Sequence, residues 1–170
     1  MKINRIWAMP NKWTFTIKPI RELLNRYVGD GTGWIDPFAG QHSPAEITND
    51  HRKDTNAKFH LDALDFCSIL PEKYKGCLFD PPYSIHEVKR HYDELEMKYD
   101  WKTDPTGGFT KVRDVIASKM PIGGIVIYFG WNSNAFGKKR GFEIVEILLV
   151  AHGGNRNDTI VTVERKIKNT

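Results

Sequence analysis

Apolar residues recur at helical spacing near the N-terminus of the chain. Between Ile20 and Tyr27 the apolar side chains stand at positions i, i+3, i+4 and i+7, which predicts an amphipathic helix. The glycines within 29–31 predict where this helix ends. The patterns at 64–70, 87–95 and 109–120 predict three further helices.

Short apolar runs separate these helices and predict strands. They lie at 33–35, 45–48, 57–61, 76–79, 122–129, 142–151 and 159–164. The polar segment 153–158 between the last two is short enough for an antiparallel hairpin. Helices that alternate with strands before a closing hairpin predict one α/β domain over residues 1–170, with a mostly parallel sheet and one antiparallel strand.

The composition fits such a domain. Of the 170 residues, 40% are hydrophobic and 12% aromatic, which is enough to form a core without disulfides or metal ions. No apolar run approaches the roughly 20 residues of a membrane-spanning helix, and the N-terminus lacks the apolar stretch of a signal peptide, so we expect a cytoplasmic protein without membrane contact. Cys67 and Cys77 are expected as buried, reduced thiols, and no spacing of Cys and His predicts a metal site. The net charge of +4 is compatible with a nucleic acid partner without requiring one.

Two predicted strands end in an acidic residue followed by a rigid turn. The first turn is Asp36-Pro37-Phe38-Ala39-Gly40, and the second is Asp80-Pro81-Pro82-Tyr83. Ligands of mostly parallel sheets bind beyond the carboxyl ends of the strands, where both turns are expected. In the second turn a carboxylate, fixed carbonyl groups and an aromatic ring lie within four residues, which suits a planar molecule that carries an amino group.

The second turn resembles the signature of the amino-group DNA methyltransferases, which transfer a methyl group from S-adenosylmethionine to an exocyclic amino nitrogen. Its Asp form is typical of adenine-N6 enzymes. The first turn resembles the methionine-binding turn of the same family, and Thr16-Ile17-Lys18-Pro19 resembles a segment that covers the cofactor. The similarity continues through 48–50, 60–64, 129–134 and 152–159. It covers most of the chain and is closest to small adenine methyltransferases of phage and prokaryotic type.

The resemblance implies a Rossmann-like class I methyltransferase fold with a seven-stranded sheet. It implies a cofactor, S-adenosylmethionine, that leaves as S-adenosylhomocysteine, and DNA as the partner. The catalytic residues would be Asp80, Pro81, Pro82 and Tyr83. The cofactor-binding residues would be Thr16, Lys18, Asp36, Pro37, Phe38, Ala39, Gly40, Asp50, Asp62 and Ala63. For Asp50 and Asp62, a purely structural role in a turn or helix cap is the alternative.

The implied mechanism needs few groups. The Asp80 carboxylate and the Pro81 carbonyl would accept the two hydrogens of the adenine amino group, which aims the nitrogen lone pair at the methyl group. Tyr83 would stack on a base that has left the duplex. No covalent intermediate with the enzyme is required.

The chain departs from the family in two places. The segment 41–44 replaces the usual glycine-containing stretch, so we expect the first crossover helix to be absent or reduced to a turn. A separate target-recognition domain is also missing, which predicts short or loose sequence specificity unless a homodimer or a partner extends the contact surface. Nucleic acid contacts are expected instead from the loop at 99–108 and from five other residues: Trp131, Asn132, Lys138, Lys139 and Arg140. The alternative is that the loops are ordinary solvated surface and that Trp131 is a buried core residue.

Two other functions remain open at this stage. RNA could replace DNA, as the acceptor of an adenine or guanine amino methyltransferase, because small RNA methyltransferases share the fold and similar turns. The chain could also be a nucleic-acid-binding subunit that keeps the fold without catalysis, although the intact Asp80 turn argues for an enzyme.

Overall fold

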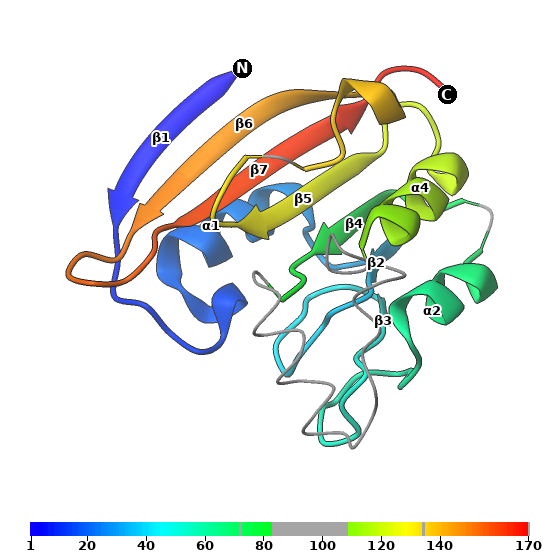
Figure 1. Cartoon of the computed structure of the whole chain (residues 1–170), viewed down its shortest axis with the longest axis horizontal. Coiled ribbons are helices and arrows are strands. Elements are labelled where there is room, and N and C mark those ends of the chain that lie inside the picture. The colour runs from blue at the N-terminus through cyan, green and yellow to red at the C-terminus, as the bar shows by residue number, and fades with distance from the viewer. Residues whose placement is uncertain (72, 83–108, 134, 170) are drawn as a thin grey trace.

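The computed structural model describes residues 1–71, 73–82, 109–133 and 135–169. Seven strands form one sheet in the order β1-β6-β7-β5-β4-β2-β3 (Figure 1). Neighbouring strands are parallel except β5 with β7 and β6 with β7, so the predicted parallel sheet with an antiparallel hairpin is confirmed. The strands are β1 (Lys2–Trp7), β2 (Trp34–Asp36), β3 (Ile47–Thr48), β4 (Gly76–Phe79), β5 (Ile125–Gly130), β6 (Phe142–Ala151) and β7 (Thr159–Lys166).

Helices cover both faces of the sheet. Helix α1 (Lys18–Tyr27) packs on one face, and α2 (Ala63–Ile69) and α4 (Phe109–Lys119) pack on the other. Two short 3-10 helices, η1 (Thr14–Thr16) and η2 (Lys138–Arg140), precede α1 and β6. The helices predicted at 20–27, 64–70 and 109–120 are therefore confirmed, and the one predicted at 87–95 lies outside the described residues.

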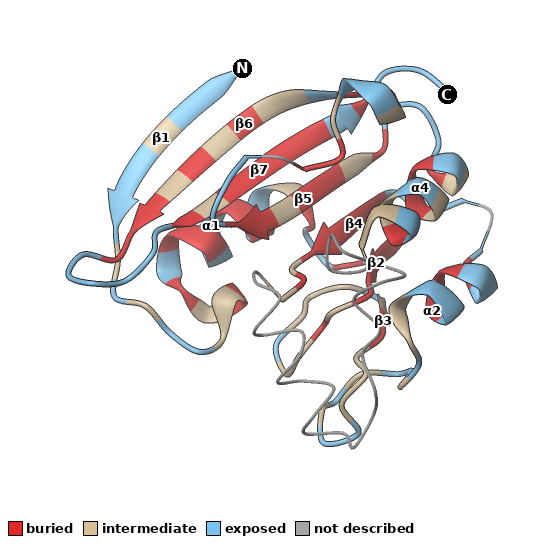
Figure 2. Cartoon of the chain, in the orientation of Figure 1, coloured by how far each residue is buried: buried red, intermediate tan, exposed pale blue. Residues whose placement is uncertain are grey.

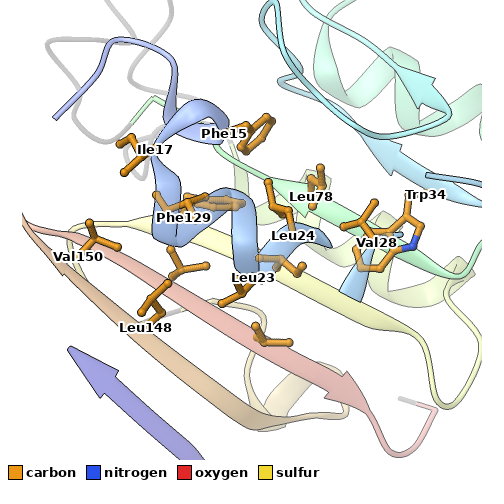
Figure 3. Close-up of a cluster of buried hydrophobic side chains, with 14 residues drawn as sticks. Phe15, Ile17, Leu23, Leu24, Val28, Trp34, Leu78, Phe129, Leu148 and Val150 are labelled. Atoms are coloured by element: carbon orange, nitrogen blue, oxygen red, sulfur yellow. The ribbon is translucent and has the colours of Figure 1, made fainter. Parts of the chain in front are cut away.

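The apolar stripe of α1 forms the core on its side of the sheet. Ile20, Leu23 and Leu24 share one buried cluster with the sheet residues Ile127 and Phe129. Figure 3 shows Leu23 and Leu24 on α1 near Phe129. Each of these helix side chains is at most 3% exposed. Burial of one such side chain contributes about 1.5–3 kcal/mol, so the stripe explains why α1 docks in this orientation.

A buried carboxylate on β6 fixes the end of α1. Glu146 accepts hydrogen bonds from both terminal nitrogens of Arg26, at 3.2 and 2.8 Å, and from the Tyr27 hydroxyl at 2.9 Å. These bonds hold the pKa of Glu146 below its usual value. The helix is thus anchored at its C-terminal turn by charge as well as by its apolar face.

On the opposite face, α2 and α4 cover a second core that includes both cysteines. Figure 2 shows the inner sides of these helices as buried. Cys67 and Cys77 are buried free thiols, as expected, and burial raises the pKa of Cys67 to about 12. The Lys119 ammonium at the end of α4 donates to the carbonyl oxygens of Cys67, Ser68 and Leu70, which caps the C-terminus of α2.

One expected strand was wrong, and one observed strand was not predicted. The segment 57–61 is not a strand, because only Phe59 forms a single bridge, to Asn49. The seventh strand is instead β1, an edge strand that is exposed over most of its length and therefore lacks the apolar run that would reveal it. In the part of the chain that the structure describes, no helix is long and apolar enough to span a membrane.

The connection from β2 to β3 contains turns and no helix, as the sequence predicts. It returns close to the start of β2, where a Cβ atom at Gly31 would collide with the Pro44 carbonyl oxygen. Gly31 also has a positive φ of 85°, which favours glycine. This close approach lets a short connection place β3 beside β2.

Candidate active site

The carboxyl ends of the parallel strands β2, β3, β4 and β5 meet at one edge of the sheet, the carboxyl edge. Asp36 is the last residue of β2, Asp50 follows β3, Asp80 follows β4 and Trp131 follows β5. Strand β4 lies between β2 and β5 (Figure 1), so Asp80, which follows β4, stands between the two halves of this edge. The structure therefore brings the residues predicted at strand ends to one edge of the sheet.

Asp36 is a fully buried carboxylic acid with ordered hydrogen bonds. Its Oδ1 accepts from the Phe38 backbone N–H at 2.9 Å, and its Oδ2 accepts from the Ser43 hydroxyl at 2.6 Å. Burial raises the pKa of Asp36 well above its usual value, and the carboxylates of Asp80 and Asp50 add to this effect. A cation bound beside these three groups would favour the ionised form.

The turn after β2 is held in one conformation by residues that follow β3. Pro37 accepts a hydrogen bond from the Asn49 side chain at 3.2 Å, and the Ala39 N–H donates to the Asn49 carbonyl at 2.9 Å. The Phe38 ring contacts the rings of Phe79 and Phe109 edge-on, at centroid distances of 5.1 and 4.9 Å. The predicted methionine-binding turn is thus a rigid element between β2 and the α4 face.

Asp50 braces the same turn through both carboxylate oxygens. Oδ2 accepts from the Gly40 N–H at 2.8 Å, and Oδ1 accepts from the Arg52 N–H at 2.9 Å. These bonds match the structural role that the sequence left open for Asp50. They also place this carboxylate next to the turn of Asp36, where the two acids interact electrostatically.

Asn49 joins the two segments that carry the predicted cofactor residues. Its side-chain nitrogen donates to the Pro37 carbonyl at 3.2 Å and to the Leu61 carbonyl at 3.1 Å, and its oxygen accepts from the Leu61 N–H at 2.9 Å. The residue is 1% exposed. Sequence reasoning did not assign it a role, and its only signal was its place inside the Thr48-Asn49-Asp50 match.

Asp62 is the N-cap of α2, and apolar side chains close to it in the sequence are partly exposed. Its Oδ1 accepts from the Leu64 N–H at 2.8 Å, and Ala63 is the first residue of the helix. Phe59, Leu61 and Leu64, all within three residues of Asp62 in the sequence, are 36–37% exposed. A carboxylate that borders exposed apolar side chains suits the edge and faces of a heterocycle, and the cap explains why an acid stands here.

The N-terminal segment lies over the turn of Gly40. The Trp13 ring contacts the His42 ring edge-on at 5.3 Å, and the Lys12 ammonium lies 4.8 Å from the centroid of the Trp13 ring. Thr16 fixes the segment because its hydroxyl donates to the Trp13 carbonyl at 2.8 Å. Lys18 opens α1 and is exposed. The chain directly before the segment that was expected to cover the cofactor, at Trp13, is therefore adjacent to the turn of Asp36, and Thr16 is hydrogen-bonded to Trp13.

The second turn begins directly after β4. Pro81 is buried, Asp80 and Pro82 are partly exposed, and Tyr83 lies outside the described residues. The Tyr128 ring from β5 stacks on Phe79, with centroids 6.1 Å apart. Burial raises the pKa of Tyr128, the Arg113 guanidinium opposes this rise, and the Asp80 carboxylate adds to it.

Trp131 and Asn132 are exposed at the carboxyl edge, on the β5 side of Asp80. The tryptophan is 42% exposed, so it is not the buried ring that was the alternative for this position. Both residues are therefore placed where an acceptor could reach them. Their contact with nucleic acid stays a prediction.

The basic residues of η2 lie elsewhere. Because η2 precedes β6, Lys138, Lys139 and Arg140 are at the edge of the sheet opposite to Asp80. The Arg140 Nε donates to Asp114 Oδ1 at 2.6 Å, while both lysines are exposed. The structure does not bring these three residues to the candidate site, and their predicted contact with nucleic acid would need a separate surface.

The acids of the site influence one another, because the carboxylates of Asp80 and Asp50 both act on Asp36. Among the described residues, no three side chains of His, Cys, Asp or Glu are close enough to bind a metal. Asp36, Asp50 and Asp80 interact electrostatically while Asp50 is committed to backbone N–H groups. What the arrangement offers is a negative, partly buried region bounded by a fixed turn and by apolar surface.

No protein-family model matches the sequence, and no curated protein is significantly similar to it in sequence. The fold, however, matches solved structures. TrmN from Thermus thermophilus matches with a TM-score of 0.57 and 16% identity, over 89% of this chain and 49% of TrmN, so the chain spans about half the length of that protein.

Two N-methyltransferases match over more of their length. NodS from Bradyrhizobium japonicum WM9 has a TM-score of 0.57 and 10% identity, over 89% of this chain and 96% of NodS. The 1,6-didemethyltoxoflavin-N1-methyltransferase from Burkholderia thailandensis, with bound 1,6-didemethyltoxoflavin and S-adenosylhomocysteine, has a TM-score of 0.56 and 11% identity, over 89% and 78%. The chain therefore has the Rossmann-like class I methyltransferase fold that the sequence predicts.

Proposed function

We propose that the chain is an S-adenosylmethionine-dependent methyltransferase that modifies the N6 amino group of adenine in DNA. The observation that carries this proposal is the place of Asp80 and Pro81 at the end of β4. On one side lie the acids of β2 and β3, and on the other lies the exposed Trp131 beyond β5. A methyl donor and a planar acceptor can thus meet from opposite sides of one carboxyl group.

The residues on the β2 side fit the cofactor. Asp36 presents a buried carboxylate whose pKa is raised by burial, and a bound ammonium group would return it to the ionised form. Asp62 and the apolar side chains of Phe59, Leu61 and Leu64 suit an adenosine group. The toxoflavin methyltransferase of the same fold binds S-adenosylhomocysteine, which supports this choice. When bound, S-adenosylmethionine supplies an activated methyl group.

The chain's own residues orient the acceptor. The amino nitrogen of adenine is a weak nucleophile because its lone pair is delocalised into the ring. The Asp80 carboxyl and the Pro81 carbonyl are two acceptors for its two hydrogens, and the proline rings fix the direction of the backbone carbonyls. Holding the nitrogen in this way favours reaction by position and electrostatics, without a nucleophile from the protein. Two structural neighbours are N-methyltransferases, which agrees with a nitrogen acceptor.

The proposal is tested by comparing Asp80→Ala with the wild type. Methyl transfer from labelled S-adenosylmethionine to adenine-containing duplex DNA is measured together with cofactor affinity by calorimetry. We expect transfer to fall by about 10²–10³-fold, the cost of removing one preorganised polar partner of a reacting group, with little change in cofactor affinity. The matched control is Asp65→Ala, an exposed acid on α2. Equal rates for Asp80→Ala and the control would contradict the proposal.

A further inference from the structure

A cavity of about 360 Å³ opens at the carboxyl edge, on the β5 side of Asp80. Three parts of the chain that are distant in sequence form it: the N-terminal segment with Asn11, the residue after β5, Trp131, and the β6–β7 hairpin with Arg156 and Asn157. Its volume is near the lower end of the roughly 300–1,000 Å³ range of ligand pockets. A group of about the size of one nucleotide fits this space better than a folded partner would.

His152 connects two walls of this cavity, the N-terminal segment and the β6–β7 hairpin, by hydrogen bonds. One ring nitrogen, Nδ1, lies 2.9 Å from the Ala8 carbonyl oxygen, and the other, Nε2, lies 2.9 Å from the Thr159 hydroxyl. Because a carbonyl only accepts, Nδ1 carries a proton, and in the neutral ring Nε2 accepts from Thr159. The backbone N–H of His152 also donates to Asp158 at 3.1 Å. The hairpin and the N-terminal segment are thus joined before any ligand arrives.

The groups that face the cavity suit a planar heterocycle attached to a phosphate. Trp131 offers an indole ring that is 42% exposed, and every nucleobase can stack on such a ring. Asn11 and Asn157 carry carboxamides, which pair with the donor and acceptor edges of bases. The Asn11 oxygen accepts from the Trp13 N–H at 3.0 Å, so the group that Asn11 offers to a base is its amide nitrogen, a donor. Arg156 has no ion pair or hydrogen bond from its side chain, within the residues that the structure describes, and the cavity lining contains no carboxylate. An anion is therefore favoured beside the guanidinium.

The position of the cavity relative to Asp80 decides which nucleotide it would take. Trp131 follows β5, Thr159 opens β7 and His152 follows β6, so the cavity is centred near β7, two strands from β4. With neighbouring strands roughly 4.8 Å apart, that is about 10 Å from the strand that carries Asp80. A base whose amino group meets Asp80 would occupy the space over β4 and β5, and the cavity remains available for the next unit of the strand.

We infer that the cavity binds the nucleotide adjacent to the target adenine and sets which sequence context is methylated. The inference rests on the proposed function and gives the chain a means of reading sequence. Trp131 stacks on the flanking base, the carboxamides of Asn11 and Asn157 select its edge, and Arg156 holds its phosphate. The acceptor is a strand of nucleic acid, and parallel assays with DNA and RNA oligonucleotides distinguish the two sources.

The test measures context preference directly. Wild type and variants methylate oligonucleotides whose positions next to a fixed adenine are randomised, and the modified positions are read by sequencing. We expect the wild type to prefer particular flanking bases, Trp131→Ala to lose this preference and bind the strand roughly 5- to 150-fold more weakly, and Trp131→Phe to restore both. Asn157→Ala relaxes the preference. Arg156→Gln weakens binding to all contexts and reduces the salt dependence of binding by about 0.7–0.9 in slope.

Arg165→Gln is the matched control, because Arg165 is exposed near the end of β7 at the opposite edge of the sheet. It should leave both preference and salt slope unchanged. If the wild type methylates all flanking contexts equally, or if Trp131→Ala and Arg156→Gln behave as the wild type does, the inference is overturned while the proposed function stands. If the wild type transfers no methyl group to any DNA or RNA, both are overturned.

Discussion

Substituting Asn49 tests whether the two cofactor-side segments depend on one side chain. Asn49→Ala removes three hydrogen bonds at once, two donated to the carbonyls of Pro37 and Leu61 and one accepted from the Leu61 N–H. All three lie within 2.9–3.2 Å, and the residue is 1% exposed, so water does not replace them easily. The turn after β2 and the segment before α2 would then lose their common support.

The expected loss follows from those three bonds. A net contribution of about 0.5–1.5 kcal/mol for each of the three hydrogen bonds gives a fall in the free energy of unfolding of about 1.5–4.5 kcal/mol. Asn49→Asp should be at least as destabilising, because it keeps the acceptor oxygen but places a second oxygen against two carbonyls. Cofactor affinity should fall as well, since the positions of Asp50 and Leu61 relative to the turn are no longer fixed.

Urea unfolding followed by circular dichroism measures this change as a lower midpoint with an unchanged slope. The matched control is Asn155→Ala in the exposed β6–β7 hairpin, which should change stability by less than about 0.5 kcal/mol. If Asn49→Ala unfolds at the same urea concentration as this control, the three bonds do not brace the site. An unchanged cofactor affinity in the folded variant would refute the positioning role by itself.

Two further predictions concern buried acids. Burial raises the folded-state pKa of Asp36, so the native state keeps the proton of this acid to a higher pH than the unfolded chain does. We therefore expect the wild type to lose stability relative to Asp36→Asn as the pH rises above the ordinary pKa of 3.8, and we expect the variant to bind the cofactor more weakly. Parallel pH profiles of the two proteins in urea unfolding would contradict this. The hydrogen bonds from Arg26 lower the folded-state pKa of Glu146, so the stability that this carboxylate contributes is present above the ordinary pKa of 4.5 and is lost as the pH falls. Glu146→Gln should lower the free energy of unfolding by about 1–2 kcal/mol at neutral pH. If the difference in stability between the wild type and this variant does not shrink in acid, the role of the ion pair is refuted.

Much of the fold could be predicted because burial leaves a pattern in the sequence. The helix at 20–27 shows its apolar stripe, and the strand at 76–79 is an apolar run that is buried at every residue because both faces of the sheet are covered there. The strand at 142–151 shows apolar residues along most of its length, interrupted by Glu143 and Glu146. The edge strand β1 escaped prediction because it packs on one neighbour and remains exposed. The segment 57–61 has the alternation of a strand but only one bridge in the structure.

The candidate site was predictable where chemistry and strand ends coincide, as at Asp36 and Asp80. It was not predictable where a residue acts through long-range hydrogen bonds, because the partners of Asn49 are twelve residues away in each direction. The basic residues at 138–140 could not be placed either, because a cluster of charge in the sequence does not indicate at which edge of the sheet it will lie. The cavity formed by three distant segments could be found only from the folded chain.

The most direct test of the proposed function is the identity of the methylated product. Purified protein is incubated with S-adenosylmethionine labelled in its methyl group and with unmethylated duplex DNA or structured RNA, and both nucleic acids are digested to nucleosides and separated. We predict label in N6-methyladenine from DNA. Label in an RNA nucleoside alone would keep the reaction and contradict the DNA acceptor, and no label in either nucleic acid would contradict the central claim that the Asp80 turn methylates a nucleobase.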